Sequence, residues 1–342
     1  MGYQRRKNLY DQIESIRGRP LISYVLSNRP GIGATMASDV IPEMCEQILR
    51  IPESERWVDV LMVGMGGDPS LAWRLISILR ERFDSIGVLI PFQAQSAATV
   101  LAFGADEIIM HPFSCLGPID PQIVARIRDD TGKPLPMENY AFSVEDVKSY
   151  IDFIREDLRL SDTESSNEAL RYLCDELRPT LIGVVKKSMK FSESLASNLL
   201  KQHMEDNKIE GIVKQFNNFS NHGYPVSRSE AISFGLPVIE SADGLDSLLW
   251  QVWEDAEKEM KCREPFDPYG ILNESDELKK LFAPGTKGNP VKTIMDEGRI
   301  AMVESTRLSS CFIIQSIIRF QRNNLNIDYN VTIVPKGWNN KE

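Results

Sequence analysis

The chain has 342 residues, of which 42% are hydrophobic and 26% charged, and its formal net charge at pH 7 is −10. This composition is typical of a globular protein with one large domain or a domain with appendages. The negative net charge argues against nonspecific nucleic-acid binding, and no apolar run has the length of a membrane span. The five scattered cysteines argue against a cysteine metal site and indicate a reduced protein of the cytoplasm.

The chain begins with a polar and charged segment, residues 1–19, which lacks the apolar stretch of a secretory signal. We therefore expect no stable membrane insertion and treat this segment as separate from the folded domain. Residues 20–27 form an apolar run that predicts the first strand, at an edge of the sheet or early in it. A loop over residues 28–37 and a helix over residues 38–50 are expected to follow.

The next stretch alternates between strand and helix patterns. Short apolar runs rich in β-branched residues predict buried strands, and apolar residues spaced three or four apart predict helices. Asp68 and Pro69 are of the types expected at a helix N-cap and at the first helical position. The alternation indicates a mostly parallel sheet covered by helices, with strands over residues 58–63, 86–91 and 108–110 and helices over residues 69–83 and 96–104.

Two features follow strands of this sheet, at the edge where open α/β sheets place their sites. Gly66-Gly67 is a turn whose backbone amides can approach a ligand closely. Ser96 stands where a helix begins, beside unpaired amides and the positive end of the helix dipole. Together they suggest a nucleophile facing an oxyanion hole. Two simpler interpretations stay open, a capping role for Ser96 and a plain tight turn; a dinucleotide loop is disfavoured because Pro69 replaces its third glycine.

The order of these features resembles the Clp-protease/crotonase superfamily, and within it the serine dehydrogenase proteinase family, which is related to signal peptide peptidase A. The resemblance covers roughly residues 20–240. It is carried by four motifs in the family's order: Gly66-Gly67, Ser96 followed by residues 105–108 (ADEI), residues 116–122 (LGPIDPQ), and residues 222–225 (HGYP) with Glu230-Ala231 and Gly235-Leu236.

The resemblance implies a Clp/crotonase-like ββα superhelix with a mostly parallel sheet, in a serine peptidase domain over residues 20–240. It implies an ATP-independent peptidase that hydrolyses peptide or protein substrates through an acyl-enzyme on Ser96, without cofactor or metal, and that forms a homo-oligomer. The amides of Gly66 and Ala97 are the expected oxyanion hole. Residues 241–342 differ in character and are treated as a C-terminal extension of helices and strands.

The remaining patterns predict mostly helices and loops. After the site motifs, an exposed excursion is expected over residues 126–140, a loop over 160–168, a capped helix over 227–234, a short strand over 237–240, and longer helices over 143–158, 170–189 and 192–204. In the extension, we expect a helix over residues 245–260, a linker or wrapping arm over 263–290, and strands, or a strand and a helix, over 300–318 and 327–334.

A nucleophilic serine needs a base, and the chain has 3 histidines. His111 is interpreted as structural and His203 as solvated. His222 lies in an irregular loop and is the preferred base, with Asp120 as the residue that orients its ring. In chain order, His222 falls near the place where Clp proteases keep their aspartate, and Asp120 near the place of their histidine. The two partners would thus be exchanged in sequence.

Other bases and functions stay open. Signal peptide peptidase relatives use a Ser-Lys pair, and Lys186, Lys187 and Lys190 lie on a predicted helix after the serine. A lysine base must be desolvated to lose its proton near neutral pH, whereas this cluster has the pattern of a solvated face. The two other functions are a catalytically inactive, peptide-binding or oligomeric scaffold of the same fold, and a crotonase-type acyl-CoA enzyme that would use Asp106 and Glu107.

Overall fold

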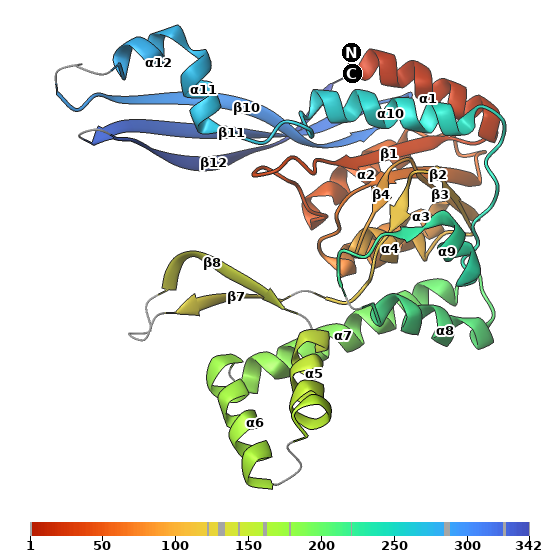
Figure 1. Cartoon of the computed structure of the whole chain (residues 1–342). Coiled ribbons are helices and arrows are strands. Elements are labelled where there is room, and N and C mark those ends of the chain that lie inside the picture. The colour runs from red at the N-terminus through yellow and green to blue at the C-terminus, as the bar shows by residue number, and fades with distance from the viewer. Residues whose placement is uncertain are drawn as a thin grey trace.

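The computed structural model of the chain describes residues 2–121, 123–128, 134–142, 144–159, 163–177, 179–219, 221–283, 288–323 and 326–341. Figure 1 shows a central sheet with helices on both faces and two groups of elements that project from it. The expected mixed α/β fold, with a parallel core and a C-terminal strand extension, is confirmed.

Seven strands form the central sheet, in the order β12-β11-β10-β1-β2-β3-β5. The strands β1, β2, β3 and β5 pair in parallel, whereas β10, β11 and β12 continue the sheet in antiparallel pairing. The bounds are β1 Leu21–Leu26, β2 Trp57–Val63, β3 Ser85–Ile90, β5 Glu107–Met110, β10 Val291–Glu304, β11 Ser309–Asn323 and β12 Asn326–Lys341.

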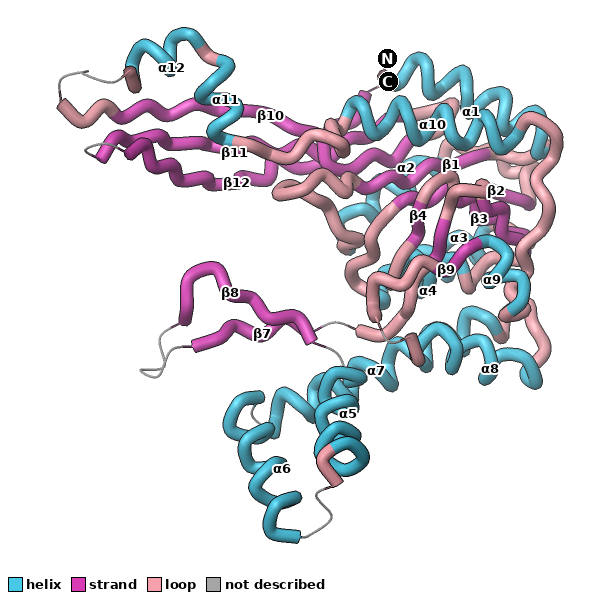
Figure 2. The backbone as a smooth tube through the Cα atoms, in the orientation of Figure 1, coloured by secondary structure: helices cyan, strands magenta, loops and turns pink. Residues whose placement is uncertain are grey.

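Alternate side chains of the parallel strands face two helical layers, because successive residues of a strand point to opposite faces. Val60 and Met62 lie in the core that α2, α3, α4, α7 and α8 cover, and Leu61 and Val63 lie in the core under α1 and α10 (Figure 2). The bounds are α1 Tyr3–Arg17, η1 Ser38–Val40, α2 Ile41–Leu49, α3 Pro69–Arg82, α4 Ala97–Ala102, α7 Pro179–Leu200, α8 Asp206–Asn217 and α10 Leu245–Glu259.

The polar N-terminal segment is a helix of the core rather than a separate part. Arg6 of α1 is buried, and its guanidinium donates hydrogen bonds to Glu304 at 2.7 and 2.8 Å and to Asp255 at 2.7 Å. Tyr10 donates to the same glutamate at 2.9 Å. These groups join α1 to α10 and β10, which lie some 250 to 300 residues further along the chain. The sequence did not predict this role, because an arginine is normally exposed and its buried carboxylate partners lie far away in the chain.

The first strand is an inner strand, so the expectation of an edge position is wrong. β1 pairs with β2 on one side and with β10 on the other, and all six of its residues are buried. The strand that covers its second side comes from the last fifth of the chain, at a sequence distance that local patterns do not reveal. The expected boundary between residues 240 and 241 remains a prediction.

The C-terminal strands continue beyond the core as an arm (Figure 1). Two short helices, α11 Pro268–Glu274 and α12 Asp276–Leu281, pack on one face of this arm. Their contact residues with the strands include Leu272, Phe282, Ile318 and Phe320. The expected linker over residues 263–290 is therefore partly helical. Of the two alternatives expected after it, strands are confirmed, because the segment forms three long strands.

A second projecting group follows the site motifs. It contains a hairpin, β7 Ile123–Arg128 with β8 Pro134–Phe142, where an exposed excursion was expected. The helices α5 Val144–Asp152 and α6 Thr163–Leu177 and the π-helical turn η2 Phe153–Asp157 complete it. The loop expected over residues 160–168 is wrong from residue 163 onward, and α7 runs unbroken through the expected gap near residue 190. Within the described ranges, no helix has both the length and the apolar character needed to cross a bilayer.

Candidate active site

A small three-stranded sheet gathers the motif residues at one edge. Its strands are β4 Gln93–Ala94, β6 Cys115–Leu116 and β9 Val226–Ser227, in the order β4-β6-β9. β4 and β6 run parallel, and β9 runs against them. Ser96 follows the end of β4, Asp120 follows the end of β6, and His222 precedes the start of β9. Because β9 is antiparallel, its start lies at the edge where β4 and β6 end. The segments that carry the three residues therefore lie at the same edge of this sheet.

The backbone of Ser96 is in an unusual conformation. Its φ is 52° and its ψ −119°, a region that costs a non-glycine residue about 1–3 kcal/mol and that clusters at functional sites. Thr99, one turn into α4, holds the surroundings: its hydroxyl donates to the Ala94 carbonyl at 2.7 Å and accepts from the Gly117 amide at 3.0 Å. The Ser96 side chain makes no capping hydrogen bond. The interpretation of Ser96 as a simple helix cap is therefore wrong.

Gly66 brings its backbone against this serine. A Cβ added at Gly66 would lie 2.7 Å from the Ser96 Cβ and 3.0 Å from the Ala97 amide nitrogen, and Gly66 has a φ of 100°. The Gly66 carbonyl accepts a hydrogen bond from the Met36 amide at 2.7 Å, so the loop before α2 fixes the turn. Ala97 is the first residue of α4, where the amide has no partner within the helix. The Gly66 backbone thus lies against Ser96 and Ala97; the assignment of the Gly66 and Ala97 amides as an oxyanion hole stays a prediction.

Asp120 and His222 meet although 102 residues separate them. The Asp120 carboxylate lies 2.7 Å from Nδ1 of His222. Asp120 is only 8% exposed, whereas 29% of the His222 side chain is exposed. An Nδ1–H that donates to the carboxylate leaves Nε2 as the ring nitrogen available for proton transfer. The loop that carries the imidazole is shaped by Asn221, whose side chain accepts from the Gly223 amide at 2.7 Å.

The segment before Asp120 is fastened to two helices. The Ile119 amide donates to the carbonyl of Phe216 in α8 at 3.0 Å, and the Ile119 carbonyl accepts from the hydroxyl of Ser192 in α7 at 2.8 Å. The position of the carboxylate therefore depends on how these helices pack. Sequence reasoning missed these contacts, and also those of Met36 and Thr99, because small polar or apolar residues in helices and loops carry no distinctive signal.

The other histidines lie in packed surroundings. His111 stacks on Trp250 at 5.0 Å between ring centroids and accepts a hydrogen bond from the Phe113 amide at 3.1 Å, and burial lowers its pKa. Nε2 of His203 lies 2.8 Å from the Phe103 carbonyl, and burial lowers the pKa of this histidine too. The expectation of a solvated His203 is therefore wrong, because its ring packs against the end of α4.

The alternative bases and acids lie elsewhere. Lys186, Lys187 and Lys190 are exposed on α7, so they lack the desolvation that a lysine base requires. Asp106 and Glu107 stand at the amino end of β5, opposite the edge that carries Ser96. Asp106 pairs with Arg80 at 2.7 Å, and Glu107 pairs with Arg17 and Arg19 at 2.6 and 2.5 Å. This arrangement is structural and argues against a crotonase-type use of these acids.

The short helix after β9 is confirmed in detail. α9 runs over Arg228–Ser233, and Ser227 and Glu230 form a reciprocal capping box at its start. Tyr224 donates to Glu230 at 2.6 Å and stacks on Phe219 at 4.4 Å, which brackets the His222 loop. Among the described residues, no cluster of three or more histidine, cysteine, aspartate or glutamate side chains is placed to hold a metal.

Comparison with known proteins bears on the family resemblance of the motifs. Residues 36–128 match the family of ClpP-like SDH-type serine proteinases, so the resemblance inferred from the motifs is confirmed over this stretch. This range contains Gly66, Ser96, Ala97 and Asp120 but not His222.

Two proteins of Methanocaldococcus jannaschii are similar over about two thirds of the chain. The uncharacterized protein MJ1495 is 25% identical over 68% of this chain and 71% of its own length. The uncharacterized protein MJ0137 is 23% identical over 68% of this chain and 72% of its own length. Among solved structures, a mutant of the membrane-bound stomatin-specific protease 1510-N has a TM-score of 0.37 and 11% identity, covering 66% of this chain and 80% of its own. ClpP1 from Listeria monocytogenes has a TM-score of 0.34 and 11% identity, covering 70% of this chain and 98% of its own.

Proposed function

We propose that the chain is an ATP-independent serine peptidase with Ser96 as nucleophile, His222 as base and Asp120 as the residue that orients the base. The observation that carries the proposal is the 2.7 Å hydrogen bond between His222 and Asp120. It supplies the base and its orienting partner at the edge of the small sheet where β4 ends and the strained Ser96 follows. The link that the proposal adds is a hydrogen bond from the Ser96 hydroxyl to Nε2 of His222.

The mechanism is acyl transfer. The Ser96 oxygen attacks the substrate carbonyl while Nε2 takes its proton, and the imidazolium then gives that proton to the leaving amine as the C–N bond breaks. A water molecule then attacks the ester carbonyl while Nε2 takes its proton, and the imidazolium returns that proton to the Ser96 oxygen as the ester bond breaks and the acid product leaves. Asp120 holds the ring and stabilises its charged form throughout.

The amides of Gly66 and Ala97 have the role of oxyanion hole in this proposal. Each donor of this kind is worth about 10²–10³-fold in rate. The Ser96 side chain makes no capping hydrogen bond to α4, which supports its assignment as the nucleophile.

The proposal extends to the surroundings of the reaction. The substrate is a peptide or protein, the peptidase domain is residues 20–240, and residues 241–342 are an extension to it. No cofactor takes part. The assembly is a homo-oligomer, as the family resemblance implies, and it is placed in the cytoplasm because of the scattered, reduced cysteines. The mass of the native protein in solution tests the oligomer directly.

Labelling with a fluorophosphonate tests the site. The wild-type chain is expected to be labelled and to cleave peptides, and Ser96→Ala and His222→Ala are expected to lose both, by about 10⁴-fold or more. Ser194→Ala, which removes an exposed hydroxyl from α7, serves as the matched control and should change neither. An unlabelled wild type, or a cleaving Ser96→Ala variant, would refute the peptidase and favour the catalytically inactive scaffold.

A further inference from the structure

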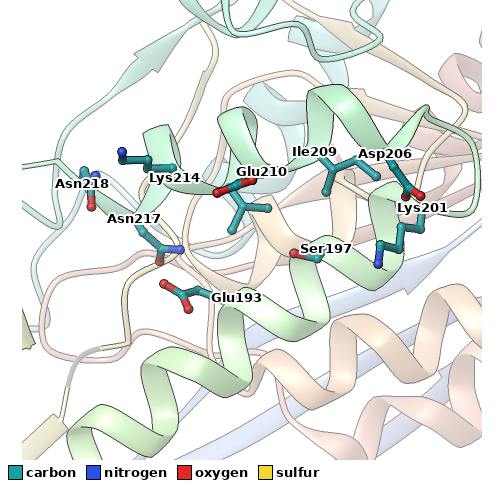
Figure 3. Close-up of a pocket in the computed structure, with 10 residues that line it drawn as sticks. Glu193, Ser197, Lys201, Asp206, Ile209, Glu210, Lys214, Asn217 and Asn218 are labelled. Carbon is teal, nitrogen blue, oxygen red and sulfur yellow. The ribbon is translucent and has the colours of Figure 1, made fainter.

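The helices that fasten Ile119 also form the walls of a separate cavity. It lies between α7 and α8 and has a volume of about 470 Å³, within the range of small-molecule sites. Figure 3 shows its lining side chains, which come from one face of each helix. Glu193 and Ser197 on α7 and Lys201 just after its end follow each other at four-residue spacing, and Asp206, Glu210 and Lys214 do so on α8.

Asn217 is the reason to regard this cavity as a binding site. The residue is 4% exposed, yet neither its amide nitrogen nor its amide oxygen has a hydrogen-bond partner among the described residues. Such a group costs free energy unless something satisfies it. In Figure 3 its amide points across the cavity toward Glu193. The missing partner must therefore offer both an acceptor and a donor from within the cavity.

The charges of the lining define what that partner is. A peptide group offers the C=O acceptor and N–H donor that a carboxamide requires. Glu193 lies beside Asn217 and suits an ammonium group. Lys201 stands eight residues after Glu193, one residue beyond the end of α7, a distance of about 12 Å. A chain of three residues extends over about 10 Å, so its two charged ends reach both positions.

We propose that the cavity between α7 and α8 binds a short peptide with free termini, with its ammonium group at Glu193, its first peptide group on Asn217 and its carboxylate at Lys201. The proposal rests on the proposed function for the source of such peptides, which are products of a peptidase. Because Ile119 is bonded to Phe216 and Ser192, the neighbours of Asn217 and Glu193, an occupied cavity stiffens the segment that carries Asp120.

Calorimetric titration of the full-length Ser96→Ala chain with trialanine tests binding without turnover. Saturable binding is expected, and Glu193→Gln, Asn217→Leu and N-acetylation of the peptide should each weaken it by about tenfold or more. Glu205→Gln, an exposed change just before α8, is the matched control and should leave binding unchanged. No saturable binding at millimolar peptide, or equal binding by the Asn217→Leu variant, would overturn the site.

Two further measurements make the result independent of folding and of catalysis. Asn217→Leu should keep or raise the melting temperature, because it replaces an unpaired amide by an apolar group of similar size; a clear decrease would show that the amide already has a partner. Trialanine should slow hydrogen exchange of the Ile119 amide in the Ser96→Ala chain, and unchanged exchange would refute the coupling. Neither result depends on fluorophosphonate labelling, so failure of this site and failure of the peptidase are distinguishable.

Discussion

The two halves of the central sheet differ in how they are buried. All residues of β1 and six of the seven residues of β2 are buried, because helices cover both faces of the parallel half. In β10 the first eight residues alternate between exposed and partly buried, the next two are partly buried, and only the last four are buried, where the strand pairs with β1. One continuous sheet is therefore a protein core at one end and a solvated arm at the other.

The difference shows where stability and chemistry reside. The candidate site lies at the carboxyl edge of the parallel half, where buried neighbours hold Ser96 in a strained conformation and Gly66 in close contact with it. Such strain persists only in surroundings that over-determine the backbone. Among the described residues of the arm, buried apolar side chains gather in the small cluster under α11 and α12. We expect substitutions in the core half to affect folding and those in the arm to be tolerated.

The largest expected effect on stability comes from the charged network of the core. Arg6→Ala should lower the free energy of unfolding by about 3–5 kcal/mol, because it leaves buried carboxylates without their cation. Lys292→Ala in the arm removes an exposed ion pair with Glu277 at 2.7 Å. It should leave the urea concentration at the unfolding midpoint unchanged, because such pairs are screened by water. Urea denaturation measures both. Equal effects would contradict the contrast between core and arm.

A matched pair of isoleucines gives the next effect. Ile22 in β1 is 0% exposed and Ile333 in β12 is 46% exposed. Ile22→Ala should cost about 2–5 kcal/mol, because it removes buried methyl groups and leaves a cavity, whereas Ile333→Ala should change stability by less than about 1 kcal/mol. Thermal and urea unfolding provide the comparison. A large loss in the Ile333 variant would mean that the arm is covered in solution, for example by a second copy.

The smallest effect concerns pH. Burial lowers the pKa of His203 and of His111, so the folded chain binds fewer protons than the unfolded chain once the pH falls below the unfolded value of about 6.5. Their contribution to stability is complete above that pH and is lost as the pH decreases toward the folded pKa values. His203→Gln, which keeps a donor for the Phe103 carbonyl, should reduce this loss, measured as the melting temperature between pH 7 and 5. An unchanged pH dependence would show that His203 does not contribute.

Local patterns predicted the elements whose cause is local. The periodic stretch from residue 57 to residue 110 folds as expected, and Asp68, Ser227 and Glu230 cap helices where their residue types predicted it. The expectations failed where a distant partner decides the outcome. β1 is an inner strand because β10 pairs with it. The polar N-terminus is a core helix because Arg6 donates hydrogen bonds to carboxylates of α10 and β10.

For the candidate site, the sequence by itself determined the kinds of residue and their order along the chain. A glycine pair, a serine before a small-residue helix, and an aspartate and a histidine in separate loops are properties of the sequence. The tertiary structure decided that Asp120 and His222 meet at 2.7 Å, that the Ser96 side chain does not cap its helix and that Asn217 is buried without a hydrogen-bond partner among the described residues. The physical reason is that residue type is local, whereas distance, burial and backbone strain depend on segments that only folding brings together.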